Sequence, residues 1–239
     1  HDATHCYILV RTDKNAPKKQ LGISMVLADM KSPGITVRPI RNIAGHAEFC
    51  EVFFDNVRVP RKNLVGKMNE GWQTAMATLS FERGTAFLAE QVKLTRLVDQ
   101  LIDIARTTAG LDGRPALADD EVARRLALLR AEVEALRSMT YRSVSRVART
   151  GMPSAEASLI RLFFSELQQR VHALAMEILG PSILEWDAAE QPAGTGAGRT
   201  RIRETWVFRW LLSFASTIAA GSKDIQRNII GDRVLGLPR

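Results

Sequence analysis

Apolar residues recur at two different spacings along this chain, and the spacing changes near residue 66. Before that point, runs rich in β-branched and aromatic residues alternate with turn sequences that contain Pro, Gly, Asn or Asp. The pattern predicts strands at residues 6–11, 23–29, 35–41 and 48–54. Together these strands are expected to form half of a small β-barrel or β-sandwich over residues 1–66.

From residue 69 onward, apolar residues recur at steps of three and four, the spacing of amphipathic helices. One long helix is predicted over residues 69–107, and a second begins at Asp119 or Asp120 and ends at Gly151. A third follows Ser154 and stops at Gly180, a fourth covers the aromatic stretch 206–214, and a short last helix opens at Ser222. The predicted fold class is therefore α+β, with an antiparallel four-helix bundle over residues 67–239.

Glu82 interrupts the apolar stripe of the predicted long helix. It lies three residues after Leu79 and four before Ala86, so the three side chains project from one face. An unpaired buried carboxylate costs several kcal/mol, so Glu82 must be paired, neutral or functional. Two interpretations stay open: a structural ion pair, with Arg83 or another cation, or a catalytic base.

Composition excludes several classes. The 239 residues are 46% apolar and contain no apolar run of 18 residues, so no membrane-spanning segment is predicted. The net charge of +7 is explained either by solvated helix faces or by attraction for a phosphate-bearing partner, and no nucleic-acid motif is present. Cys6 and Cys50 lack motif spacing and the four histidines lack ligand spacing, which indicates a reducing, cytoplasmic setting and no metal site. The chain opens on His1 without an initiator Met, so an N-terminal part is expected to precede it.

Three sequence blocks together resemble the acyl-CoA dehydrogenase family. They are F-F-D-N-V-R-V-P-R-K-N-L-V-G at 53–66, G-W-Q-T-A-M-A-T-L-S-F-E-R-G at 71–84, and G-S-K-D-I-Q-R-N-I-I-G-D-R-V-L-G-L-P-R at 221–239. The resemblance implies the second half of a middle β-domain followed by the complete C-terminal helical bundle. The segment by itself is then expected to bind FAD poorly and to be inactive.

The resemblance also implies the chemistry. Such enzymes act in lipid metabolism of the fatty-acid β-oxidation type: a carboxylate removes the α-proton of an acyl-CoA thioester, and a hydride leaves to N5 of FAD. Most members carry this base in a loop before the last helix, where this chain has Ala220. Some relatives carry it on the long helix in a Glu-Arg pair, which matches Glu82-Arg83. Burial of a Glu raises its pKa toward the range that a general base needs.

Other positions follow from the same resemblance. Ser80 and Arg83 match positions near the CoA moiety, and Gly221 matches the residue whose backbone borders the thioester. Ser222 and Asp224 match FAD-contacting residues at the start of the last helix, although Ser222 is equally well explained as a plain N-cap.

Two stretches depart from the family pattern, and both serve the FAD of a neighbouring subunit in relatives. Residues 110–115 keep only a Gly-Arg-Pro, with Asp112 in place of the usual Phe, and the usual Gln-x-x-Gly-Gly reads Glu-Ile-Leu-Gly-Pro at 177–181. A homo- or hetero-oligomer of the dimer-of-dimers type is expected, and this chain is hypothesised to be the catalytic partner of an asymmetric pair. Electron-transfer flavoprotein is the expected acceptor. Acyl-CoA oxidase chemistry and a non-catalytic bundle subunit remain the alternatives.

Overall fold

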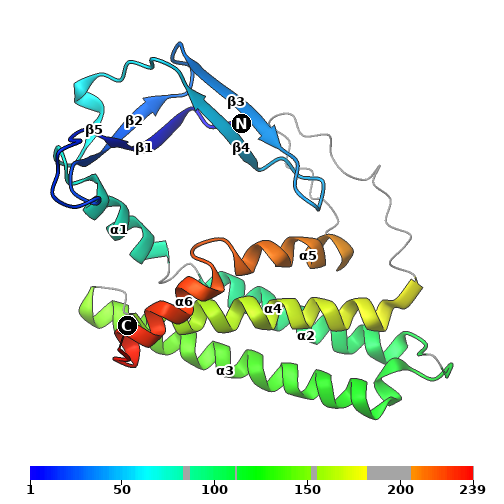
Figure 1. The fold of residues 1–239 in the computed structure, drawn as a ribbon. Coiled ribbons are helices and arrows are strands. Elements are labelled where there is room, and N and C mark those ends of the chain that lie inside the picture. Colours follow the sequence, from blue (N-terminus) through cyan, green and yellow to red (C-terminus); the bar gives the residue numbers. More distant parts are fainter. Residues whose placement is uncertain (83–86, 111, 152–154, 182–205, 239) are drawn as a thin grey trace. The chain divides into compact units, whose positions relative to one another are not determined.

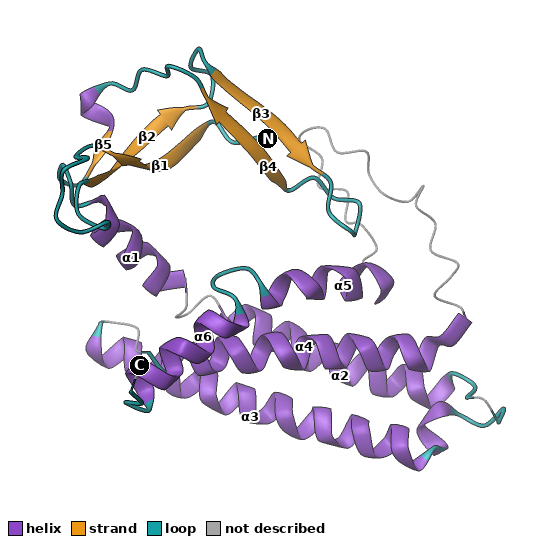
Figure 2. Cartoon of the chain, viewed as in Figure 1, coloured by secondary structure: helices purple, strands orange, loops and turns teal. Residues whose placement is uncertain are grey.

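The computed structural model describes residues 1–82, 87–110, 112–151, 155–181 and 206–238, without the side chains of residues 80–82 and 87. Contacts within the chain divide it into two compact units: His1–Ser80, which holds the strands, and Phe81–Glu190 together with Arg201–Arg239, which holds most of the helices (Figures 1 and 2).

The first unit contains two small antiparallel sheets. Strands β1 (His5–Arg11), β2 (Ile23–Asp29) and β5 (Leu64–Val65) form one sheet in the order β1-β2-β5, and β3 (Ile35–Ile40) pairs with β4 (Phe49–Phe54) in the other. In the β1–β2 pair, His5 lies opposite Asp29 and Arg11 opposite Ile23. The four predicted strands are confirmed to within one residue at each end. β5 was not predicted, because two residues are too few to show a period of two.

Helix α1 (Gly71–Glu82) begins at a tight joint on strand β2. The hydroxyl of Ser24 accepts a hydrogen bond from the backbone N–H of Asn69, at 2.8 Å, and lies 2.7 Å from the hydroxyl of Thr12. Gly71 packs directly on the strand, since a Cβ placed there would lie 2.4 Å from the backbone nitrogen of Met25. No side chain fits at that distance, which explains the glycine at the first position of the helix.

The second unit is a helical bundle built around α4 (Figure 1). Its helices are α2 (Phe87–Thr107), α3 (Asp120–Thr150), α4 (Ala157–Leu179), α5 (Trp206–Ser213) and α6 (Lys223–Ile229). Short 3₁₀ turns lie at Ala116–Ala118 and Phe214–Thr217, and a π-helical turn, Ile230–Val234, extends α6. α4 packs against α2, α3, α5 and α6, and its fully buried residues include Leu167, Val171 and Leu174. The predicted antiparallel bundle is confirmed.

The helix ends follow the capping chemistry of the sequence. Asp119 is the N-cap of α3, and its carboxylate accepts hydrogen bonds from the N–H groups of Glu121 and Val122, both at 2.9 Å. Gly151 ends the same helix in the left-handed region, at φ 72°. Ser222 caps α6 by accepting from the N–H of Ile225 at 3.4 Å. The predicted Ser154 cap lies outside the described residues.

The predicted apolar stripe over residues 69–107 is buried only in its second part. In α2, the side chains of Leu94, Val98 and Leu101 are at most 1% exposed, but Trp72 and Met76 of α1 are each 37% exposed. Residues 71–80 group with the strands, and among the described residues of that unit no second α-helix covers their apolar face. Ala75 and Leu79, which share the predicted face of Glu82, are half-buried, and the buried position of Glu82 itself stays a prediction because its side chain lies outside the described residues.

Candidate functional site

The predicted site residues fall in two stretches of the chain, residues 80–83 and residues 221–224. Glu82 is the last residue of α1, and Ser80 precedes it by two positions, but the side chains of both lie outside the described residues. Arg83 lies outside them altogether. Gly221 and Ser222 form the turn that leads into α6, and the exposed Asp224 is in the first turn of that helix. The roles of these residues stay predictions, whereas the turn at residues 219–222 can be described in atomic detail.

The backbone carbonyls of this turn are bound from the buried side. A guanidinium nitrogen of Arg161, on α4, donates to the carbonyl of Ala219. The side-chain amide of Gln226, on α6, donates to the carbonyls of Ala220, at 3.0 Å, and of Gly221, at 3.3 Å. Three consecutive carbonyls therefore face two buried donors, since Arg161 is 4% exposed and Gln226 only 1%.

The N–H groups of the same peptides face the other way. In a trans peptide the N–H points opposite to the carbonyl that precedes it. With the carbonyls of residues 219–221 directed inward, the N–H groups of Ala220, Gly221 and Ser222 are directed away from Arg161 and Gln226. None of the three donates a hydrogen bond to another described residue. A row of free backbone donors is suited to bind a carbonyl oxygen or another electron-rich atom.

The turn has a strained backbone. Ala220 adopts φ 53°, in the left-handed region that costs a non-glycine residue about 1–2 kcal/mol, and Gly221 follows at φ 94°. A Cβ at Gly221 would lie 2.5 Å from the side-chain nitrogen of Gln226. Position 221 therefore needs glycine both for its backbone angle and for the close approach of the Gln226 amide.

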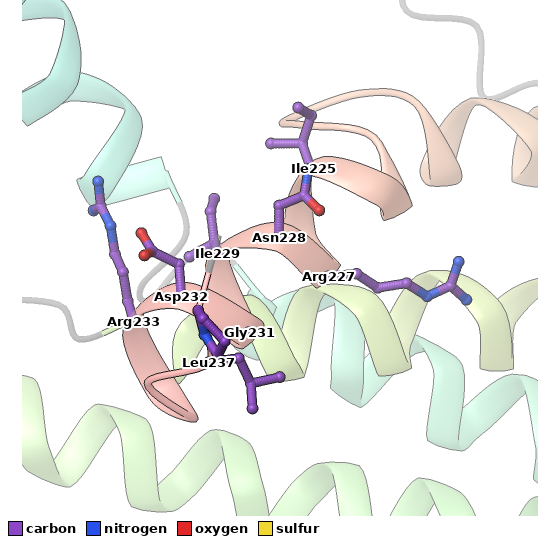
Figure 3. A pocket seen from close by; sticks show the side chains of 9 residues that line it. Ile225, Arg227, Asn228, Ile229, Gly231, Asp232, Arg233 and Leu237 are labelled. Carbon is purple, nitrogen blue, oxygen red and sulfur yellow. The ribbon is translucent and has the colours of Figure 1, made fainter.

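A hollow of about 690 Å³ lies along α6 and the π-helical turn that follows it. Figure 3 shows its side chains, all of which come from residues 225–238. Arg227 extends toward α4, where its guanidinium pairs with Glu166 at 2.7 Å (Figure 3). Because a single segment supplies every lining residue, the hollow is an open surface that needs a second wall before it can enclose a ligand.

Both stretches that depart from the family pattern have their charges satisfied within this chain. Asp112 pairs with Arg114 at 2.7 Å, and Glu177 pairs with Arg125 of α3. The Arg114 and Arg125 guanidinium groups hold the pKa values of Asp112 and Glu177 below their usual range, through direct hydrogen bonds. Polar groups that are engaged in this way are not available to a neighbouring subunit without breaking an ion pair.

The described part of the chain lacks two further kinds of feature, a metal-binding cluster and a membrane-spanning helix. No group of three or more His, Cys, Asp or Glu side chains is arranged there to hold a metal ion. Among the helices described, none combines the length and the apolar character that crossing a bilayer requires.

Comparison with known proteins decides the family. The family model described as "Acyl-CoA dehydrogenase, C-terminal domain" matches residues 69–235, which contain the turn at 219–222 and all the helices named above. The chain belongs to the acyl-CoA dehydrogenase family. The fold predicted from the three sequence blocks is thereby confirmed.

One relative is similar in sequence over the whole chain, including the strands. Acyl-CoA dehydrogenase IpdE1 of Mycobacterium tuberculosis (strain ATCC 25618 / H37Rv) is 34% identical over 239 residues, which is 100% of this chain and 57% of that protein. The chain thus spans little more than half the length of this acyl-CoA dehydrogenase.

Solved structures agree with this assignment. The ChsE4-ChsE5 complex from Mycobacterium tuberculosis matches 99% of this chain and 58% of its own, with a TM-score of 0.76 and 28% identity. The structure titled "Tcur3481-Tcur3483 steroid ACAD G363A variant" matches 100% of this chain and 58% of its own with a TM-score of 0.82, and at 24% identity it supports the fold alone.

Arg161 and Gln226 were not singled out from the sequence. Arg161 has a signal that could have found it, because it lies between Ile160 and Phe164 in the apolar stripe of α4, as Glu82 lies in the predicted stripe of the long helix. Gln226, four residues before the buried Ile230, gives a weaker signal of the same kind. In each case the bound carbonyl belongs to the turn, and no periodicity predicts that contact.

Proposed function

We propose that the full protein catalyses the FAD-dependent α,β-dehydrogenation of an acyl-CoA thioester, with Glu82 as the base that removes the α-proton. Family membership supports the reaction class. The observation that carries the proposal is the turn at residues 219–222, whose free N–H groups are suited to bind the thioester carbonyl oxygen. Hydrogen bonds to that oxygen stabilise the negative charge that develops there when the α-proton leaves.

The assignment of the base rests on chemistry rather than on a described contact. Ala220 has only a methyl group, so the turn supplies hydrogen-bond donors but no proton acceptor. A carboxylate is the side chain expected to remove the weakly acidic α-proton, and Glu82 occupies the position at which some relatives carry one. Ser80 and Arg83 are proposed to bind the CoA moiety, where the fixed charge of Arg83 is suited to phosphate.

The residues at the start of α6 fit a flavin. The hydroxyl oxygen of Ser222 accepts from the N–H of Ile225, which leaves the hydroxyl proton free to donate to a flavin carbonyl. Asp224 is exposed, and its carboxylate can accept from a hydroxyl or N–H group of the cofactor, because its pairing with Arg227 is long, at 3.5 Å. We therefore assign Ser222 and Asp224 to FAD, which supplies the hydride acceptor when bound.

An asymmetric assembly fits the ion pairs of Asp112 and Glu177. Both lie in stretches that serve a neighbour's FAD in relatives, and both are paired with arginines of this same chain. The name of the ChsE4-ChsE5 complex shows that a related protein assembles from two different chains. On these grounds this chain is proposed to be the catalytic partner in a heteromer, with electron-transfer flavoprotein as its electron acceptor.

Substitution of Glu82 tests the proposal. The full-length protein, co-purified with any partner chain, is mixed with a panel of acyl-CoA thioesters while flavin bleaching is followed. Glu82→Gln is expected to bind FAD and to lower the rate of bleaching by several orders of magnitude, because the proton acceptor is lost. Glu70→Gln, an exchange of the same kind just before α1, serves as the matched control.

Four results would contradict parts of the proposal. Unchanged bleaching in the Glu82→Gln protein would move the base to another residue. A full-length protein that never binds flavin would favour the non-catalytic bundle subunit, and a homotetramer with one FAD per chain would exclude the asymmetric assembly. Oxygen consumption coupled to acyl-CoA turnover would favour the oxidase.

A further inference from the structure

Two buried polar side chains of the bundle have no part in the reaction as described so far. Arg161 is on α4 and Gln226 is on α6, 65 positions further along the chain. A buried guanidinium and a buried amide each oppose folding unless they are hydrogen-bonded. In this chain Arg161 donates to the carbonyl of Ala219, and Gln226 donates to the carbonyls of Ala220 and Gly221.

These hydrogen bonds hold a backbone shape that the turn would not adopt readily by itself. Ala220 and Gly221 are consecutive residues with positive φ, and the first has a Cβ. Such a conformation persists only where the surrounding structure enforces it. Two groups hold the turn in this conformation. The Gln226 amide binds two of the three carbonyls, and the Arg161 guanidinium binds the third.

Docking of α6 onto α4 does not depend on these bonds alone. Arg227 of α6 pairs with Glu166 of α4 at 2.7 Å on the exposed side. The side-chain amide of Gln169, on α4, donates to the carbonyl of Ser213 and to the hydroxyl of Thr217, both at 3.4 Å, and so holds the segment just before the turn. The chain therefore offers two polar contacts of α4, one with α6 and one with the segment before the turn, that do not touch residues 219–221.

We propose that Arg161 and Gln226 are positioning residues of the reaction: by binding the carbonyls of residues 219–221, they aim the N–H groups of Ala220 and Gly221 at the thioester carbonyl oxygen of the substrate. This inference rests on the proposed function. A peptide that rotates about its flanking bonds carries its N–H with its carbonyl, so loosening either inward contact redirects an outward donor. Donors aimed beforehand stabilise developing charge more effectively than donors that must reorient.

The test uses the full-length flavoprotein with its partner chain and reads carbonyl polarisation directly. The probe is para-dimethylaminocinnamoyl-CoA, a chromophoric enoyl-CoA whose absorbance moves to longer wavelength when its carbonyl oxygen accepts hydrogen bonds. Arg161→Met and Gln226→Leu remove the inward donors while keeping most of the side-chain volume. Arg161→Lys keeps one donor and serves as the rescue. Gln169→Leu and Glu166→Gln are the matched controls.

Arg161→Met and Gln226→Leu are expected to lose most of the red shift of the bound probe. They should also slow flavin reduction by an acyl-CoA substrate about 10- to 100-fold, with little change in the dissociation constant of the probe. Arg161→Lys should recover most of both signals, and the two controls should match the unmodified protein. If Gln226→Leu does not fold, Gly221→Ala replaces it, because the added Cβ pushes on the same amide.

Two outcomes count against the inference, and they differ. A full red shift and an unchanged rate in folded Arg161→Met and Gln226→Leu proteins would overturn the positioning role and leave the proposed function standing. A probe that binds the unmodified protein without any red shift would show that the turn does not contact the carbonyl, and would overturn that part of the proposed function together with this inference.

Discussion

Arg125 on α3 and Glu177 on α4 form a two-point ion pair, with guanidinium nitrogens 2.5 and 2.9 Å from the two carboxylate oxygens. The pair joins α3 to α4, and its two residues are 52 positions apart in the sequence. It also engages the residue that replaces the family's usual glutamine. One contact therefore links two helices of the bundle and engages the carboxylate of Glu177 within this chain.

Breaking this ion pair should lower the free energy of unfolding by a small amount that depends on pH. Glu177→Gln is expected to lower the free energy of unfolding by about 0.5–1 kcal/mol at pH 7, because the pair is partly exposed and screened by water. Arg125 holds the pKa of Glu177 below the ordinary 4.5. Its stabilisation is thus present above pH 4.5 and is lost as the pH falls through the lower pKa of the folded state.

Urea unfolding at several pH values checks this prediction. The difference between the two proteins should be constant from pH 7 to about pH 5 and should shrink below pH 4.5. Asp103→Asn serves as the control, because it removes an ion pair that lies within a single helix, α2. A difference that grows in acid would contradict the prediction.

His172 should make the bundle sensitive to mild acid. The ring is 1% exposed, and its Nδ1 lies 2.7 Å from the carbonyl of Gln168, so Nδ1 carries the proton in the neutral form. Burial lowers the pKa of His172 below 6.5. The unfolded chain therefore binds a proton more readily than the folded one, and stability falls as the pH drops below 6.5 toward the lower folded pKa.

Thermal unfolding between pH 7.5 and pH 5 measures this effect. His172→Gln is expected to flatten the pH dependence while lowering stability at neutral pH, because an amide fills the site less well than the ring. His5→Gln, a change at an exposed histidine, should leave the curve unaltered. Equal acid sensitivity in the His172→Gln protein would assign the effect to other groups.

Two adjacent leucines of α3 should differ sharply in how much they contribute to stability. Leu129 is 4% exposed in the core, whereas its neighbour Leu128 is 48% exposed. Leu129→Ala is expected to cost about 2–5 kcal/mol, because it removes buried surface and leaves a cavity. Leu128→Ala should cost less than about 1 kcal/mol. Denaturant unfolding compares the two, and equal losses would contradict the assigned core face.

The start of α3 offers a similar comparison between neighbours. Asp119 accepts from two backbone N–H groups, whereas Asp120 is an exposed residue in the first turn. Asp119→Ala is expected to cost about 1 kcal/mol through loss of the cap, and Asp120→Ala only a few tenths through the helix dipole. A larger loss for Asp120→Ala in the same unfolding measurement would move the cap by one residue.

Much of the fold could be predicted because its signals are local. Asp119, Gly151 and Ser222 act at the helix ends where the sequence pattern expected them, since capping depends on neighbouring residues. The apolar face of α3, with Leu126, Leu129 and Val133, is buried as the period of 3.6 predicts. Local chemistry also explains why the strand ends agree to within one residue.

The candidate site could be predicted only in part, because its contacts are distant in sequence. Arg161 binds a carbonyl 58 positions further along the chain, and no local pattern encodes that pairing. The exposure of Trp72 and Met76 has a similar origin, since it depends on which elements cover α1 and not on the spacing within it. The roles of Glu82, Ser80, Arg83, Gly221, Ser222 and Asp224 stay predictions for the experiments above.

The joint between Ser24 and α1 has a consequence for the position of Glu82. Helix α1 has twelve residues, and Glu82 at its far end lies roughly 16 Å along the helix axis from Gly71. A bulkier residue at position 71, or the loss of the Ser24 hydroxyl, would tilt the whole helix and displace its last residue most. Substitutions in the sheet are thus expected to shift Glu82 from a distance and, on the proposed function, to change the rate of dehydrogenation.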